Sequence, residues 1–145
     1  MSQENVETVR RAISAINARE IDAYLACCTE NVELLQPLVG AQYFGADGIR
    51  RFFTDIEDIG PDLRIEVQRV QAIGDSNAIA FVRVSATGRA SGIVTGAESA
   101  NVYDFTEGKI RRIRIFLDRS EALKAVGLGR VGGVAGERGD RTPDV

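Results

Sequence analysis

Apolar residues recur at helical spacing in three stretches of the chain. Within each stretch they fall three or four residues apart and therefore share one face of a helix. The stretches cover residues 6–16, 21–28 and 49–56. Gly60 and Pro61 follow the third stretch, and neither residue continues a helix. The pattern predicts two N-terminal helices and a third helix that ends before Gly60.

Elsewhere apolar and polar residues alternate, which is typical of strands with one buried face. A short strand is predicted at residues 32–36, where Pro37 stops it because proline cannot donate to a ladder. A loop leads from there to the third helix. From residue 63 onward the alternation runs through further segments, with turn-forming residues such as Gly92 and 106–108 between them. These segments predict an antiparallel meander.

The C-terminal part of the chain divides into a helix and a tail. Residues 118–121 form a capping box that opens a short helix ending at Gly127. The rest is rich in glycine and charge and has little to bury, so we expect a disordered tail. Its GLGRVGG segment follows no strand and opens no helix, which excludes a nucleotide-binding loop. We expect one α+β domain over residues 1–126, with a curved sheet wrapped around helices, and a tail over 127–145.

Composition narrows the classes of function. The 145 residues carry a net charge of −3, so no broad positive field attracts nucleic acid or an anionic membrane. No apolar run approaches the ~20 residues of a membrane span, and a polar N-terminus does not resemble a signal peptide, so we expect a cytoplasmic protein. Histidine is absent, which removes the commonest general base and metal ligand. The adjacent Cys27 and Cys28 are predicted to be free, buried thiols. We expect no metal and no cofactor.

Three segments of the sequence resemble a known family. They are VELLQPLVG at 32–40, YFGADGI at 43–49 and NVYDFTEGKIRRIRIFLD at 101–118, and a helix pair precedes them. Together they resemble the SnoaL-like branch of the nuclear transport factor 2-like superfamily over residues 3–126. The resemblance implies a cone-shaped, curved antiparallel sheet around the N-terminal helices and a pocket on its concave face. It also implies a homodimer formed through the convex face.

The resemblance does not by itself fix an activity, because the superfamily includes isomerases, cyclases, epoxide hydrolases, dehydratases and binding modules. In ketosteroid isomerases a catalytic Asp precedes a Pro-Val-Gly segment, and Gln36 stands in the similar place here. An amide cannot accept a proton at neutral pH, so the isomerase mechanism is not supported at Gln36. The acid that stabilises the oxyanion in those enzymes corresponds to Asn101, which can still donate a hydrogen bond to a carbonyl.

The acids that two other branches imply are also missing at the matching places. Epoxide hydrolases carry an Arg and an Asp on one face of a strand, where this chain has Ser99, Asn101 and Tyr103. Polyketide cyclases carry an acid near the last strand, where Ile113 and Ile115 stand. The resemblance therefore indicates a pocket and leaves its general base unidentified.

Amides with inward parity beside aromatic residues predict a small-molecule site. Two interpretations of Gln36 remain open, a ligand contact or a buried amide paired with backbone or with Asn101. Tyr24 lies on an apolar stripe, which is more typical of packing. Helical phase assigns Phe52 to the core and Phe53 to the cavity wall. The candidate ligand-binding residues are Tyr24, Gln36, Tyr43, Phe53, Asn101 and Tyr103.

Two classes of function remain open. The first is an isomerase, cyclase or hydrolase acting on a small hydrophobic carbonyl or polycyclic compound, with Asn101 and Gln36 as polarising donors. It requires an inward carboxylate from Glu33 or Asp118, although strand parity turns Glu33 outward. The second is a non-catalytic dimeric module that holds a small hydrophobic molecule, which the missing acids favour. Arg112 and Arg114 form a basic pair on one face of the last strand. We assign this pair to the convex face, with acidic partners on the neighbouring strands.

Overall fold

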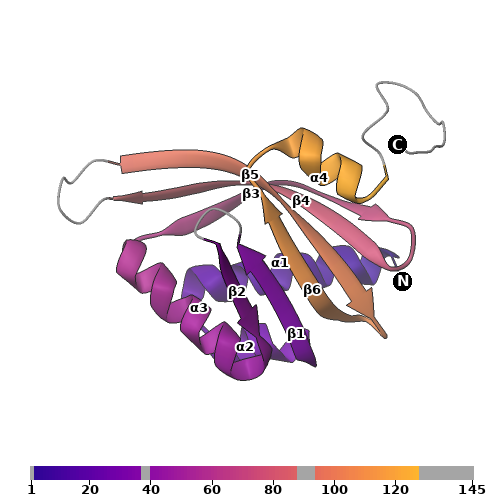
Figure 1. Ribbon diagram of the computed structural model, residues 1–145, viewed down its shortest axis with the longest axis horizontal. Helices are drawn as coiled ribbons and strands as arrows, with labels where there is room; N and C mark the ends of the chain where they lie inside the picture. The colour runs from indigo at the N-terminus through magenta and orange to yellow at the C-terminus, as the bar shows by residue number, and fades with distance from the viewer. Residues whose placement is uncertain (1, 37–39, 88–93, 128–145) are drawn as a thin grey trace.

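The computed structural model describes residues 2–36, 40–87 and 94–127 of the chain. The predicted strand stop at Pro37, the turn at Gly92 and the tail beyond residue 127 lie outside the described residues. Figure 1 shows how the helices and strands of these ranges are arranged in space. Their order is α1 (Ser2–Ala18), α2 (Ile21–Ala26), β1 (Cys28–Gln36), β2 (Ala41–Phe44), α3 (Gly45–Ile59), β3 (Arg64–Ile73), β4 (Asn77–Thr87), β5 (Val94–Thr106), β6 (Lys109–Phe116) and α4 (Arg119–Ala125).

The helices and the meander are found where the hydrophobic pattern predicts them, and two boundaries differ. The second helix stops at Ala26, because the chain from Cys28 onward pairs with β6 and the Ile110 amide donates to the Cys27 carbonyl at 2.8 Å. The segment before α3 is not a loop, since β2 pairs with the end of β1 in an antiparallel hairpin. Tertiary pairing outweighs the local pattern in both places.

The strands form one six-stranded sheet in the order β2-β1-β6-β5-β4-β3. Neighbours are antiparallel except β1 and β6, which run parallel. The sheet is curved, and α1, α2 and α3 lie on its concave side (Figure 1). The chain therefore has the expected α+β architecture, with one parallel pair in a sheet that was expected to be antiparallel.

The register of the strands decides which side chains face the helices. Asn101 on β5 lies between Ala80 on β4 and Ile115 on β6, so these three residues share one face. On the other half of the sheet, Leu34 pairs with both Tyr43 and Ile113. All six residues point to the concave side, where the main core and the cavity lie.

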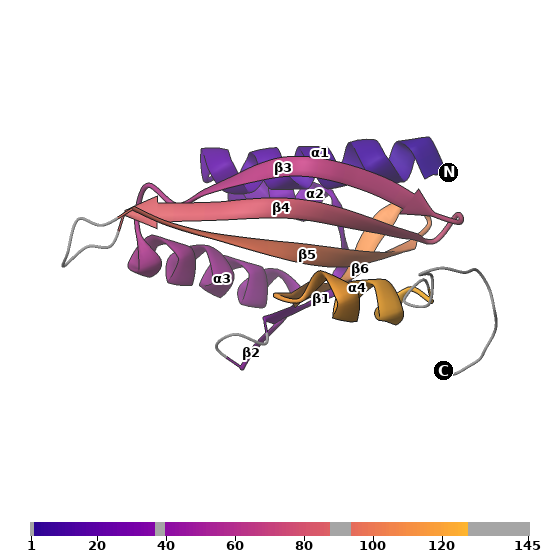
Figure 2. The same cartoon turned by 90° about the horizontal axis from the view of Figure 1, so that it is seen from above.

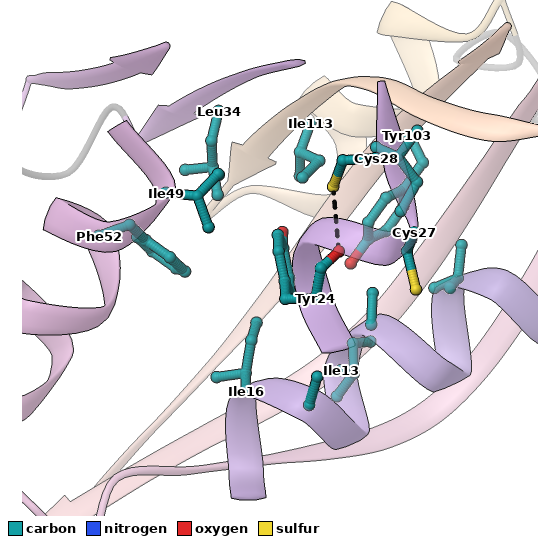
Figure 3. Close-up of a cluster of buried hydrophobic side chains, with 14 of the residues drawn as sticks. Ile13, Ile16, Tyr24, Cys27, Cys28, Leu34, Ile49, Phe52, Tyr103 and Ile113 are labelled. Carbon is teal, nitrogen blue, oxygen red and sulfur yellow. Dashed lines mark hydrogen bonds between the residues drawn. The ribbon is translucent and has the colours of Figure 1, made fainter. Parts of the chain in front are cut away.

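Aromatic and aliphatic side chains from the three N-terminal helices fill the main core. Tyr24 is 2% exposed, and its ring packs edge to face against Phe53 with centroids 5.6 Å apart. Figure 3 shows Tyr24 between Ile13 and Ile16 of α1 and the Cys28 side chain, whose thiol donates to the Tyr24 carbonyl at 3.4 Å. Burial of such side chains is the dominant stabilising term of this core.

A second apolar cluster lies on the convex side of the sheet. There α4 places Ala122 against buried residues of β4 and β5 such as Phe81 and Val102. Figure 2 shows α4 and α1 on opposite sides of the strands. Arg119 holds α4 in place, because its guanidinium lies 5.0 Å from the centre of the Phe81 ring and 3.5 Å from Glu98 Oε1.

The outer edge of β3 is met by a side chain of α1. Asn17 Nδ2 donates to the Ile65 carbonyl at 2.8 Å, and the Ile65 amide donates to Asn17 Oδ1, also at 2.8 Å. This amide satisfies both backbone groups of Ile65, as a neighbouring strand would. None of the described helices is both long enough and apolar enough to cross a membrane.

Candidate functional site

A cavity of about 510 Å³ lies between the C-terminal half of α3 and the concave face of the sheet. Its wall is mostly apolar, and the exposed side chains of Ile59 and Leu117 stand at its mouth. Among the described residues, polar side chains enter it from β1, β2, α3, β4 and β5. The apolar wall includes Phe52, Ile56, Leu63, Ile65, Val84 and Ile115.

The molecule has a larger hollow of about 630 Å³ between α1 and β3. Charged surface residues such as Arg10, Arg64 and Glu66 border it, and it is the more open of the two. Binding sites for small molecules are concave and mostly apolar with a few convergent polar groups. The cavity on the concave face fits this description, and the groove beside α1 does not.

A phenol and a carboxylate meet in the cavity. The Tyr43 hydroxyl donates a hydrogen bond to Asp55 Oδ2 at 2.6 Å. Tyr43 comes from β2, whose last residue is followed directly by α3, and Asp55 lies on the face of α3 that turns toward the sheet. Gly48 permits this close approach, since a Cβ there would stand 2.7 Å from the carbonyl carbon of Tyr43.

The surroundings of Tyr43 keep its phenol protonated. Burial and, after it, the hydrogen bond to the Asp55 carboxylate together raise the pKa of Tyr43 to about 12, against the opposing effect of the nearby Arg51. The Arg51 guanidinium carbon lies 4.8 Å from the centre of the Tyr43 ring, and Phe52 packs against the same ring edge to face at 5.4 Å. Tyr43 is therefore a hydrogen-bond donor throughout the neutral pH range.

A buried amide lies elsewhere on the wall. Asn101 is 7% exposed, its Nδ2 donates to the Tyr103 hydroxyl at a long 3.5 Å, and its Oδ1 has no hydrogen-bond partner. Burial raises the pKa of Tyr103 to about 12, and the bond from Asn101 opposes that rise. An unpaired buried amide oxygen costs about 1–3 kcal/mol, which marks Asn101 as a polar group not placed there for stability.

The structure brings together three of the six candidate ligand-binding residues. Gln36, Tyr43 and Asn101 line the cavity. Tyr103 lies behind Asn101 in the core, and Tyr24 is a packing residue of the same core.

Helical phase assigned the two phenylalanines of α3 the wrong way round. Phe52 lines the cavity, whereas Phe53 is 4% exposed and packs on Tyr24 in the core. The reason is that α3 turns its Phe52 and Ile56 side toward β2 and the cavity, while Phe53 points at α2. A stripe that is apolar over more than one face does not reveal which side meets the sheet.

The inward carboxylate comes from a residue that sequence reasoning did not select. Glu33 pairs with Phe44 and Arg112 on the convex face, and Asp118 caps α4 by accepting from the Ser120 amide at 2.8 Å. Neither is among the described residues of the cavity, whereas Asp55 and Asp58 are. The signal for Asp55 was its spacing, three residues after Phe52 and therefore on the same helical face.

The two cysteines and the carboxylates offer no metal site within the described parts of the chain. Cys27 and Cys28 are free and buried, as expected. Burial and, after it, the neighbouring Cys27 together raise the pKa of the Cys28 thiol to about 12. A protonated thiol is a poor nucleophile, so the chemistry of the site rests on its carboxylates, phenol and amides.

Comparison with known proteins places this geometry in a family. The model of the SnoaL-like domain matches residues 9–113. Among solved structures, the chain is similar to SalBIII, an epoxide hydrolase/cyclase-like enzyme with a role in pyran ring formation in the polyether salinomycin. The two sequences are 22% identical, the match covers 79% of this chain and 90% of that chain, and the TM-score is 0.69. None of the curated proteins compared with the chain matches it.

Two further solved structures share the fold. A nuclear transport factor 2-like protein of unknown function from Burkholderia pseudomallei has 17% identity, covers 86% of this chain and 98% of its own, and has a TM-score of 0.71. A protein with a ketosteroid isomerase-like fold from Catenulispora acidiphila, solved in complex with trimethylamine, has 12% identity, 83% and 92% coverage, and a TM-score of 0.71. At these identities the likeness establishes the fold alone.

Proposed function

The chain belongs to the SnoaL-like domain family, and from this premise we propose that its cavity binds a small hydrophobic molecule and acts on it as an isomerase, cyclase or hydrolase. The observation that carries the proposal is the cavity of about 510 Å³ on the concave face, where an apolar wall surrounds Gln36, Tyr43, Asp55 and Asn101. Its size lies within the range of about 300–1,000 Å³ typical of small-molecule sites.

The substrate is a carbonyl or polycyclic compound in this proposal, and the two amides orient it. An amide group carries two N–H donors. Asn101 directs one of them at Tyr103 over a long distance, which leaves its second N–H for a substrate carbonyl. Gln36, at the end of β1, provides the other amide of the cavity. Donors directed at a carbonyl stabilise the negative charge that develops on it during proton transfer.

A second candidate function is a non-catalytic module that binds a small hydrophobic ligand. The observation that favours it is the presence of Gln36 and Asn101 at two places where related isomerases carry acids. In this version the cavity holds its ligand without turning it over. A screen of hydrophobic ketones for both binding and turnover separates the two functions, because a module binds without forming product.

Binding itself is tested with acetylnaphthalene, a neutral bicyclic ketone, by isothermal titration calorimetry. Ala97→Trp places a large ring in the mouth of the cavity and is expected to weaken binding at least about tenfold. Ala46→Trp makes the same change at an exposed position of α3 that does not line the cavity, and should leave affinity unchanged. If the two variants bind equally well, the probe occupies another part of the molecule and the proposed site is wrong.

We extend the proposal to the assembly and the location of the protein. A homodimer would pair the convex faces of two sheets, at the part of that face left open beside α4. The exposed Phe44 on the edge strand β2 points to that side and supports this arrangement. Sedimentation of the purified protein tests it. A cytoplasmic location is part of the same proposal, and in that reducing compartment the two thiols would stay free.

A further inference from the structure

Asp55 occupies an unusual position for a carboxylate. It lies on the cavity side of α3, half-buried, three residues after Phe52 and next to Ile56, and all three residues line the same apolar wall. Taking a carboxylate out of water costs free energy unless another group compensates. The contacts of the Asp55 carboxylate must therefore offset part of this free energy.

One oxygen of Asp55 is held by the protein. Oδ2 accepts the 2.6 Å hydrogen bond from Tyr43, whose raised pKa of about 12 makes it a lasting donor. Within the described ranges no Lys or Arg forms an ion pair with Asp55, while Arg19, Arg50 and Arg51 along the same region are directed at Glu57, Asp47 and the Gln42 carbonyl. The carboxylate is thus fixed in direction and is not neutralised by a cation.

We infer that Asp55 is the general base of this site, that Tyr43 is the residue that positions it, and that the substrate is a neutral hydrophobic compound with an acidic C–H next to a carbonyl. The inference rests on the proposed function, since it requires that a hydrophobic molecule binds in the cavity. Of the two carboxylates that line the cavity, Asp55 is assigned as the catalytic residue because it is half-buried and held by Tyr43, whereas Asp58 is exposed.

The step needs no co-reactant. The lone pair of Asp55 Oδ1 takes a proton from the carbon beside the carbonyl, and the electrons of the broken C–H bond move to the carbonyl oxygen to form an enolate. The amide of Asn101 stabilises that oxygen. The protonated Asp55 then returns its proton to a different carbon, which gives an isomer. Alternatively, the enolate carbon attacks a second carbonyl carbon of the same molecule, the π electrons of that C=O bond move to its oxygen, and this oxygen takes the proton from Asp55, which gives a ring that carries a hydroxyl group.

The charge of the lining residues supports a neutral substrate. Among the described residues of the cavity, Asp55 and Asp58 carry charge and none is basic. A substrate carboxylate would be repelled by both, with no cation in the wall to compensate. An uncharged ketone is not repelled, and only the free energy of removing it from water opposes its binding.

The base is tested with nitrobenzisoxazole, a neutral bicyclic compound that reports proton abstraction whatever the natural substrate is. A base removes its ring C–H proton, the N–O bond breaks with its electrons going to oxygen, and a coloured nitrophenolate nitrile forms. We expect Asp55→Asn to lower kcat/KM for this reaction by about 100-fold or more. Asp47→Asn removes a carboxylate of the same helix outside the cavity, and should change kcat/KM by less than about twofold.

Tyr43→Phe tests the positioning role. The Asp55 carboxylate then loses the hydrogen bond that fixes its direction, so kcat for the probe is expected to fall by about tenfold while KM changes by less than about twofold. A Tyr43 that served packing alone would leave kcat unchanged. Circular dichroism of each variant confirms that the fold is retained.

The rate of the wild-type protein is a test that does not depend on whether a variant folds. Its second-order rate with the probe should exceed that of free acetate by about 100-fold or more. If wild type binds acetylnaphthalene but is no faster than acetate, or if folded Asp55→Asn keeps the rate, Asp55 is not the base while the binding proposal stands. If neither compound binds, the proposed function and this inference are both wrong.

Discussion

Gly48 is the residue on which the geometry of the site depends most directly. An added Cβ would stand 2.7 Å from the Tyr43 carbonyl carbon and 3.0 Å from its Cα, and backbone atoms cannot rotate away. Gly48→Ala should gain about 1 kcal/mol in helix propensity and lose about 1–3 kcal/mol to overpacking. With the middle of the overpacking range, the net fall in the free energy of unfolding is about 1 kcal/mol, measured by urea denaturation.

The same substitution should also disturb the Tyr43 and Asp55 pair, because it pushes β2 away from α3. Thr54→Ala, at an exposed site of α3, is the control and should change stability by less than about 0.5 kcal/mol. An unchanged or raised stability for Gly48→Ala would show that the strand and the helix separate without cost.

Sequence reasoning found the residues of the cavity whose direction follows from strand parity. Gln36, Tyr43 and Asn101 are such residues, and the resemblance to the family pointed to two of them. The places of Asp55 and Phe52 in the cavity were not predicted, because they depend on which side of α3 faces the sheet. That side is set by the packing of α3 against β2 and α2. The pairing of Tyr43 with Asp55 joins two elements, and no local pattern contains it.

At the level of elements, β5 and β6 are joined by one carboxylate on the convex face. Asp104, 6% exposed, accepts from Arg112 Nε at 2.8 Å, from Arg114 at 3.5 Å and from Asn77 Nδ2 at 2.6 Å. The acidic cross-strand partner expected for the two arginines is thus confirmed. This contact connects β4, β5 and β6 through a single side chain.

Asp104→Asn should therefore lower the free energy of unfolding by about 2 kcal/mol. Breaking a fully buried ion pair costs about 3–5 kcal/mol, and the smaller value follows because Arg112 and Arg114 remain 33% and 25% exposed. Glu98→Gln, which weakens half-exposed pairs with Arg83 and Arg119, should cost no more than about 0.5 kcal/mol. Equal effects in chemical denaturation would mean that burial of Asp104 contributes nothing.

Most elements could be predicted because their hydrophobic period is long and regular. The four-residue strand β2 is too short to show a period, and it forms because Leu34 and Gln36 offer it a partner. The parallel pairing of β1 with β6 joins segments about 80 residues apart in the sequence, and nothing in the pattern of either strand sets their direction.

At the scale of the whole molecule, the acidic lining of the cavity should select ligands by charge. We expect naphthoate to bind at least about tenfold more weakly than acetylnaphthalene, which has the same ring system without the charge. Added salt should narrow the difference, because Asp58 at the mouth is exposed and therefore screened. Calorimetric titration of both compounds checks this, and equal affinities would show that the carboxylates do not act on the ligand.

The overall architecture followed from the resemblance to the family, and the family match and the solved structures confirm it. The volume of the cavity was beyond prediction, because large residues such as Phe52, Phe53 and Phe105 could have filled it. They leave it open since Phe53 and Phe105 pack into the core and only Phe52 borders the space.

The amide of Asn17 has a consequence that extends beyond the single molecule. An uncovered edge strand presents unpaired N–H and C=O groups with which a strand of another molecule can pair, and such pairing leads to aggregation. At Ile65 both groups are already occupied by Asn17, so a foreign strand finds no ladder to continue there. One side chain at the end of α1 thus removes Ile65 from the part of the β3 edge that could pair with a second copy of the chain.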